Sequence, residues 1–216
     1  MLATMMVSSG FAKDDYKAKM DAFVSNLLGK MTVDEKIGQL NLTICSEFVS
    51  GQINDNSTTV RDNLKKGALG GLFGFKDAKQ IKELQKMAVE NSRLHIPLIF
   101  GYDVVHGYDV TFPIPLALSS SWNPNIVETM ARISAKEAAS DGVCWTYAPM
   151  VDICHDARWG RIAEGAGEDP YLGSVMAKAY IHGFQGDNDL SKNTNIMACV
   201  KHFALYGASE AGRDYN

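Results

Sequence analysis

Five short apolar segments, each separated from the next by a stretch of helical periodicity, most constrain what this chain can fold into. Strands buried on both faces are apolar throughout, and when they alternate with helices they form a parallel sheet. The sequence therefore predicts an α/β fold whose sheet is either doubly wound or closed into a barrel. The predicted strands span residues 41–45, 70–75, 97–100, 143–148 and 196–200.

Local start signals place the helices. Thr32 and Glu35 have the spacing of a capping box, and Asp77 precedes a long periodic stretch as an N-cap. The dipeptides at 123–124 and 169–170 combine a capping side chain with a proline at the first helical position. The predicted helices span 14–28, 33–39, 57–66, 78–93, 124–139 and 170–184.

The composition excludes several classes of function. A formal net charge of −4 over 216 residues provides no basic surface for nucleic acid, and no segment contains about 18 uninterrupted apolar residues for a membrane span. The glycine-rich segment 67–74 lacks the lysine of a phosphate-binding loop, so a nucleotide site is a weak reading. The four cysteines form no CxxC pair, and we expect them to be unpaired small hydrophobes rather than zinc ligands or disulfides.

The first twelve residues are apolar and then small, ending at Ala12 before a charged segment. This pattern is typical of the back half of a secretory signal peptide, and the alternative is a disordered cytosolic tail. We expect residues 1–12 to be a signal-peptide remnant and residues 13–216 to form the folded part.

Polar side chains follow three of the predicted strands. In a parallel α/β fold, the carboxyl ends of the strands meet at one edge, where active sites assemble. The sequence therefore predicts a shared cleft at this edge. The side chains are Asp103 and His106 in the first set, Asp152, His155, Asp156, Arg158 and Arg161 in the second, and Lys201 and His202 in the third.

The third set raises a geometric question. Successive side chains of a regular strand point to opposite faces, so Lys201 and His202 cannot enter one cleft from a regular strand. We therefore expect an irregular backbone here, including a strained or non-proline cis peptide bond.

Charged side chains of both signs suit a neutral polyhydroxy ligand, because a charged partner strengthens a hydrogen bond to about 1.5–3 kcal/mol. Asp, Arg, Lys and His together can hold several hydroxyls of one sugar ring. Trp159 lies between the two arginines and is equally compatible with a sugar-stacking platform or with a buried loop core.

The segments IPLIFGYDVVHG, TFPIPLALSSSWNP, YAPMVDICHDARWGRIAEGAGEDPYLGS and CVKHFALYGASEAGRDYN resemble the glycoside hydrolase family 3 β-glucosidases, and TVDEKIGQLN is similar to that family's opening segment. The match runs in order from about residue 27 to residue 216 and looks most like the periplasmic bacterial branch. The resemblance implies an incomplete (β/α)8 TIM-like barrel, retaining hydrolysis of β-glucosides or oligosaccharides, no cofactor, and a periplasmic or secreted location.

The resemblance also implies roles for individual residues. Asp103, Arg161, Lys201 and His202 would line the subsite of the cleaved glucose unit. Arg158 is a further substrate-binding candidate, or braces its loop by pairing with Glu164 or Asp169. His106 and Asp152 are expected to contact the sugar-binding residues rather than the sugar itself.

Retaining hydrolysis needs two carboxylates about 5–5.5 Å apart. The family's nucleophile is an aspartate in a V-S-D-type strand end after the KHF segment, and its acid/base follows later, so both are expected beyond Asn216. The chain is therefore expected to bind a sugar without hydrolysing it, and its barrel to lack the last strands.

Three alternatives remain open from the residues. Lys201 at a strand end is compatible with a Schiff-base lysine of an aldolase-like barrel. The same residues are compatible with a sugar-binding module that does not hydrolyse its ligand. A metal site built from Asp152, His155 and His202 is the third, although these residues have no recognised ligand spacing.

Overall fold

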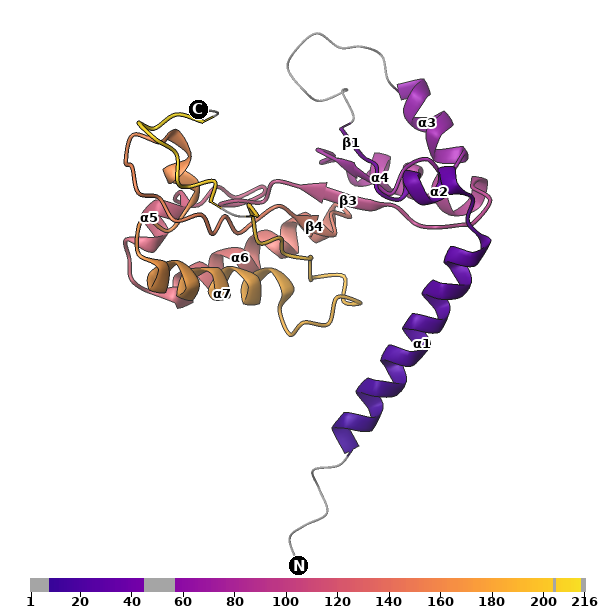
Figure 1. Ribbon diagram of the computed structural model, residues 1–216, viewed down its shortest axis with the longest axis horizontal. Helices are drawn as coiled ribbons and strands as arrows, with labels where there is room; N and C mark the ends of the chain where they lie inside the picture. The colour runs from indigo at the N-terminus through magenta and orange to yellow at the C-terminus, as the bar shows by residue number, and fades with distance from the viewer. Residues whose placement is uncertain (1–7, 45–56, 204, 215–216) are drawn as a thin grey trace, which may run out of the picture.

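The computed structural model describes residues 8–44, 57–203 and 205–214, and its centre is a four-stranded parallel sheet (Figure 1). The strands are β1 (Leu42–Ile44), β2 (Gly71–Phe73), β3 (Ile99–Tyr102) and β4 (Trp145–Thr146). Each strand pairs with the next one along the chain, so the order β1-β2-β3-β4 contains no reversal. The α/β fold with a parallel sheet that the alternation predicts is confirmed.

The predicted helices are all present, and their starts agree with the capping signals. Thr32 forms the capping box with Glu35, and Asp77 accepts hydrogen bonds from the backbone N–H groups of residues 79 and 80. Two five-residue elements, one α-helical and one 3-10, were not predicted, because such short elements carry little periodicity. The helices are α1 (Ser8–Lys30), α2 (Val33–Gly38), α3 (Ser57–Lys65), α4 (Ala78–Asn91), α5 (Pro115–Ser119), α6 (Pro124–Ser140), the 3-10 helix η2 (Gly160–Glu164) and α7 (Pro170–Gln185).

The two faces of the sheet have different surroundings. Leu72 and Phe100 share one face and are buried in the core that the helices form. Leu42 and Ile99, which share the opposite face with Gly71, have 40% and 41% of their surface exposed. Among the described residues, one face of the sheet therefore lacks a complete cover.

The predicted strand at residues 196–200 is wrong as a regular strand. The segment runs parallel to β4 but forms only isolated bridges, at Met197 with Trp145 and at Lys201 with Met150. Pro149 lies between the two bridges on the β4 side, and a proline has no N–H to donate to the ladder. The pairing is therefore interrupted just before Lys201 and His202.

Helix α1 extends away from the rest of the molecule (Figure 1). Its apolar stripe is exposed, with 46% of the surface of Met20 and 68% of that of Phe23 accessible. Residues 1–7 of the expected signal-peptide remnant lie outside the described residues, while residues 8–12 begin α1. Among the described helices, none combines the length and the apolar character that a membrane crossing requires.

A buried carboxylate connects the end of α1, helix α2 and the segment that follows α4. Glu35 of α2 accepts two hydrogen bonds from Arg93, at 2.9 and 2.5 Å, and Arg93 also donates to the carbonyl of Lys30 at 2.9 Å. The hydrogen bond from Arg93, with a further one from the Thr32 backbone, lowers the pKa of Glu35 to about 2.

The N-cap of α4 gives the first testable prediction. Asp77→Ala should destabilise the protein by about 1 kcal/mol, because two backbone N–H groups lose their acceptor. Thermal unfolding should show a fall in Tm of about 2–4 °C. Asp77→Asn is the matched control and should unfold close to the wild type, because asparagine caps equally well. Equal losses in both variants would contradict the capping role.

Glu35 gives a prediction of pH dependence. A carboxyl whose pKa is lowered by folding adds stability above its ordinary pKa of 4.5, and this contribution is lost as the pH falls toward 2. Glu35→Gln should therefore lower Tm at pH 7, and the difference from the wild type should shrink between pH 4.5 and 2. The control is Glu83→Gln on the exposed side of α4. A difference that stays constant down to pH 2 would rule out the ion pair as its source.

Candidate active site

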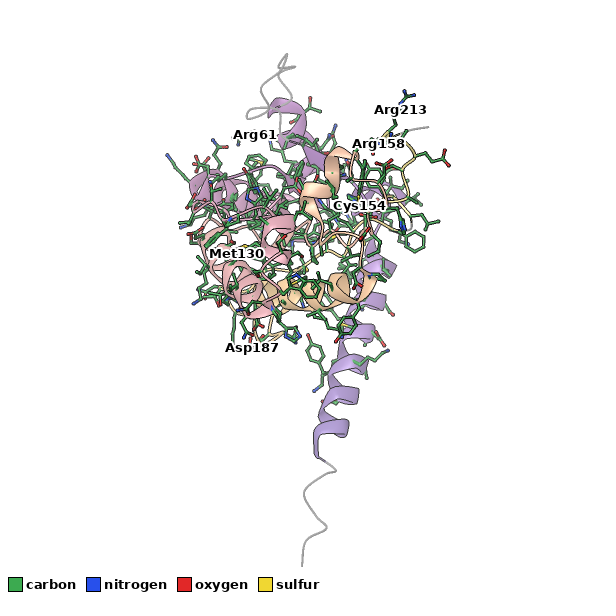
Figure 2. The ribbon with its side chains drawn as sticks, turned by 90° about the vertical axis from the view of Figure 1, so that its left-hand side faces the viewer. Arg61, Met130, Cys154, Arg158, Asp187 and Arg213 are labelled. Atoms are coloured by element: carbon green, nitrogen blue, oxygen red, sulfur yellow. The ribbon has the colours of Figure 1, made fainter. Side chains whose placement is uncertain are left out.

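The loops that follow β3 and β4 meet the segment around Lys201 and His202 at one end of the sheet. Figure 1 shows α5 and the C-terminal segment together at this end. In Figure 2, Arg158 and Arg213 lie close together in the upper part of the view, whereas Asp187, just after α7, lies below the body of the fold. The shared edge predicted from the sequence is the place where the charged side chains gather.

Lys201 lies between two carboxylates from different loops. Its Nζ atom is 3.6 Å from Oδ1 of Asp103 and 3.9 Å from Oε2 of Glu164. Only 14% of the Lys201 side chain is exposed, whereas 46% of that of Asp103 is accessible. The ammonium group is therefore largely enclosed by protein. Its more accessible side is the one next to the Asp103 carboxylate.

Arg161 and Glu164 form a two-hydrogen-bond ion pair on η2. Nε of Arg161 donates to Oε1 of Glu164 at 2.6 Å, and Nη2 donates to Oε2 at 2.7 Å. This pairing raises the pKa of the Arg161 guanidinium and lowers that of the Glu164 carboxyl. Glu164 thus joins Arg161 to Lys201.

His202 is held on both ring nitrogens. Its Nδ1 lies 2.8 Å from Oδ2 of Asp152, which also accepts the His202 backbone N–H at 3.1 Å. Its Nε2 lies 3.4 Å from Nη1 of Arg161. A guanidinium nitrogen can only donate, so this contact assigns Nε2 as the acceptor and places the ring hydrogen on Nδ1, facing Asp152.

These contacts bring together the four predicted side chains, Asp103, Arg161, Lys201 and His202. We call these four residues, with Glu164 and Asp152, the charged cluster. The peptide bond between Lys201 and His202 is cis, so the expectation of an irregular, non-proline cis backbone is confirmed. The sequence reading missed Glu164 as a member. Its i, i+3 spacing from Arg161 on a helical turn was the available signal.

Arg158 does not form either of the two predicted ion pairs. Its guanidinium pairs with Asp156 at 2.6 Å rather than with Glu164 or Asp169, and 72% of its side chain is exposed. The pairing lowers the pKa of Asp156 to about 2. Asp156 is two residues away, so the local pair forms at little cost in chain entropy, while Arg161 occupies Glu164.

Trp159 belongs to the loop core, and the sugar-stacking alternative is wrong. Only 1% of its surface is exposed, and its indole N–H donates to Oδ1 of Asp214 at 2.6 Å. Its ring contacts that of Tyr206, with 5.3 Å between the ring centroids and the planes nearly perpendicular at 81°. Tyr206 and Asp214 were both missed in the sequence, because nothing local links them to Trp159.

The remaining candidates lie outside the charged cluster or behind it. His106 interacts through Nδ1 with the carbonyl of Phe112 at 2.8 Å and so orders its own loop. His155 is exposed, and no group of three potential metal ligands occurs among the described residues. The described cysteines 144, 154 and 199 are free thiols, while Cys45 lies outside the described residues.

Comparison with known proteins identifies the family. The model of the Glycosyl hydrolase family 3 N terminal domain matches residues 32–216. A periplasmic beta-glucosidase of Salmonella typhimurium is 47% identical over 196 residues, which are 91% of this chain and 25% of that protein. A putative beta-xylosidase of Formosa agariphila is 32% identical over 242 aligned residues, covering 100% of this chain and 32% of that protein.

Solved structures agree with this result. The crystal structure of beta-glucosidase from Listeria innocua in complex with glucose superposes with a TM-score of 0.79 at 41% identity, covering 90% of this chain and 28% of that one. The chain thus spans about a quarter to a third of the length of these relatives. Because the family model matches most of its residues, the chain belongs to glycosyl hydrolase family 3.

Proposed function

We propose that the charged cluster is part of the glucose-binding subsite of a retaining β-glucosidase, in which Asp103, Arg161, Lys201 and His202 hold the hydroxyls of the sugar to be cleaved. The observation that carries this proposal is the convergence of these four side chains from three separate loops. The glucose complex of the Listeria innocua relative supports the choice of ligand.

The chemistry of the cluster suits a ring of hydroxyls. Lys201 and Arg161 supply donors only, Asp103 supplies acceptors, and Nε2 of His202 is an acceptor in the tautomer that the Arg161 contact assigns. A sugar hydroxyl both donates and accepts, so it bridges a cation and a carboxylate without leaving either unpaired. Arg158 has a different role, bracing the loop through Asp156.

We propose that residues 13–216 form part of a (β/α)8 TIM-like barrel. Sequentially ordered parallel strands are the arrangement of such a barrel, and its strands point one face to the interior. The partly exposed face that carries Leu42, Ile44 and Ile99 is then the interior face, which further strands would cover.

The hydrolytic groups are proposed to lie beyond Asn216. Glu164 is engaged by Arg161 and Lys201, and Asp152 is engaged by His202, so both serve to hold cationic or donor groups. Retaining hydrolysis needs a nucleophile and an acid/base that are not committed in this way. We assign these 216 residues to sugar binding, and the Schiff-base alternative for Lys201 gains no support from the relatives.

We also propose a periplasmic or secreted location. The support is the name of the Salmonella typhimurium relative, a periplasmic beta-glucosidase, and the apolar, small-residue pattern of residues 1–12.

Titration of the 216-residue chain with glucose tests the proposal. The ¹H–¹⁵N signals of residues 103, 161, 201 and 202 should shift together and saturate. Asp103→Asn should weaken binding by about five- to tenfold, because it replaces a hydrogen bond to a charged group by a neutral one. Asp109→Asn is the matched control, since Asp109 lies in the same loop but pairs with Lys76. Xylose, titrated in parallel, tests whether the glucose hydroxymethyl group contributes.

Three results would contradict the proposed function. Absence of saturable shifts with either sugar, or equal affinity of Asp103→Asn and Asp109→Asn for glucose, would remove the binding role of Asp103. Cleavage of an aryl β-glucoside by the purified 216-residue chain would show that the hydrolytic carboxylates lie within it.

A further inference from the structure

The last described segment of the chain, residues 205–214, packs against the loop that carries Arg161. We call it the C-terminal strap. Gly212 has φ +73°, and a Cβ atom added to it would lie 2.6 Å from the backbone carbonyl carbon of Arg158. The strap therefore approaches the Arg158 backbone more closely than any residue with a side chain allows.

One carboxylate ties two aromatic rings together at this contact. Asp214 accepts the indole N–H of Trp159 on Oδ1 at 2.6 Å and the hydroxyl of Tyr206 on Oδ2 at 3.1 Å. Trp159 is 1% exposed, so its indole N–H needs an acceptor inside the protein. Asp214 supplies it from a position 55 residues away along the chain.

The Tyr206 ring in turn contacts two members of the charged cluster. Its centroid lies 4.9 Å from that of His202, with the rings nearly perpendicular at 87°. The guanidinium carbon of Arg161 lies 5.3 Å from the same centroid, within the range of a cation–π contact. Tyr206 thus borders both side chains that share the 3.4 Å contact between Nη1 and Nε2.

These contacts complete the support of His202 and Arg161. Asp152 holds Nδ1 of His202 and Arg161 contacts Nε2, but hydrogen bonds at ring nitrogens lie near the ring plane and leave the ring free to move out of that plane. The Tyr206 ring, nearly perpendicular to the imidazole with 4.9 Å between centroids, restricts such movement because the two rings are in contact. Arg161 is likewise held on one side by Glu164 and covered on another by Tyr206.

We propose that Asp214 is a positioning residue for the sugar subsite, which it holds in geometry by locking Tyr206 against His202 and Arg161. The role rests on the proposed function, because it matters for binding only if those two side chains contact the sugar. Asp214 itself acts through Trp159 and Tyr206. Precise placement of binding groups depends on such supporting contacts, which fix their rotamers.

The test compares Asp214→Ala, Asp214→Asn and Arg213→Ala in the 216-residue chain. Asp214→Ala should lower glucose affinity by about tenfold, the equivalent of one hydrogen bond to a charged group. Asp214→Asn should retain part of the affinity, because its amide oxygen still accepts the indole N–H. Arg213→Ala is the matched control, since Arg213 is the neighbouring exposed residue of the strap (Figure 2).

Two NMR signals report on the lock without any sugar. The indole N–H of Trp159, assigned with Trp159→Phe, should move and exchange faster with solvent in Asp214→Ala. The imidazole ¹⁵N shifts of His202 should also change in Asp214→Ala and stay at their wild-type values in Arg213→Ala. A purely structural role would lower Tm and move the indole signal but leave the imidazole shifts unchanged.

The outcomes separate this proposal from the proposed function. If the wild type does not bind glucose, the sugar assignment fails, and the imidazole shifts alone decide whether Asp214 positions His202. If the imidazole shifts and the glucose affinity of Asp214→Ala equal those of Arg213→Ala, the positioning role is overturned, whatever the indole signal does.

Discussion

The carboxylate of Glu164 is the interaction on which the charged cluster depends. It accepts two hydrogen bonds from Arg161 and lies 3.9 Å from Nζ of Lys201. Two cations enclosed at the same end of a sheet would repel each other and resist burial without such a counter-charge. Because Glu164 lies on the same short helix as Arg161, the loop after β4 itself carries the acceptor for the Arg161 guanidinium.

The same edge explains why residues so far apart in the sequence meet. Parallel strands deliver their following loops to one side, so Asp103 after β3 and Asp152 after β4 become neighbours of Lys201 and His202. The segment before Lys201 follows β4 without forming a continuous ladder. Lys201 then reaches Asp103, while His202 reaches Asp152 and Arg161.

Local signals made the fold and part of the site predictable. The capping side chains Thr32 and Asp77 act within a few residues, and the polar sets after the strands follow from sheet topology alone. The contacts that the sequence did not predict depend on packing in the folded chain or on which of several acceptors a donor reaches. Nothing in the sequence links Asp214 to Trp159 across 55 residues, and the pairing of Arg158 was wrong because Asp156 was the nearer acceptor.

The distances within the charged cluster distinguish two tightly hydrogen-bonded pairs from one looser pair. The pairs Arg161–Glu164 and His202–Asp152 have contacts of 2.6–2.8 Å, the length of strong hydrogen bonds between charged or polar groups. Lys201 and Asp103 are 3.6 Å apart, and Asp103 is the more exposed partner. A hydroxyl placed between Lys201 and Asp103 would improve on a long contact, whereas one placed within the Arg161–Glu164 or His202–Asp152 pair would have to replace a short one. On the proposed function, the sugar therefore enters from the Asp103 side and leaves the arginine and histidine pairs intact.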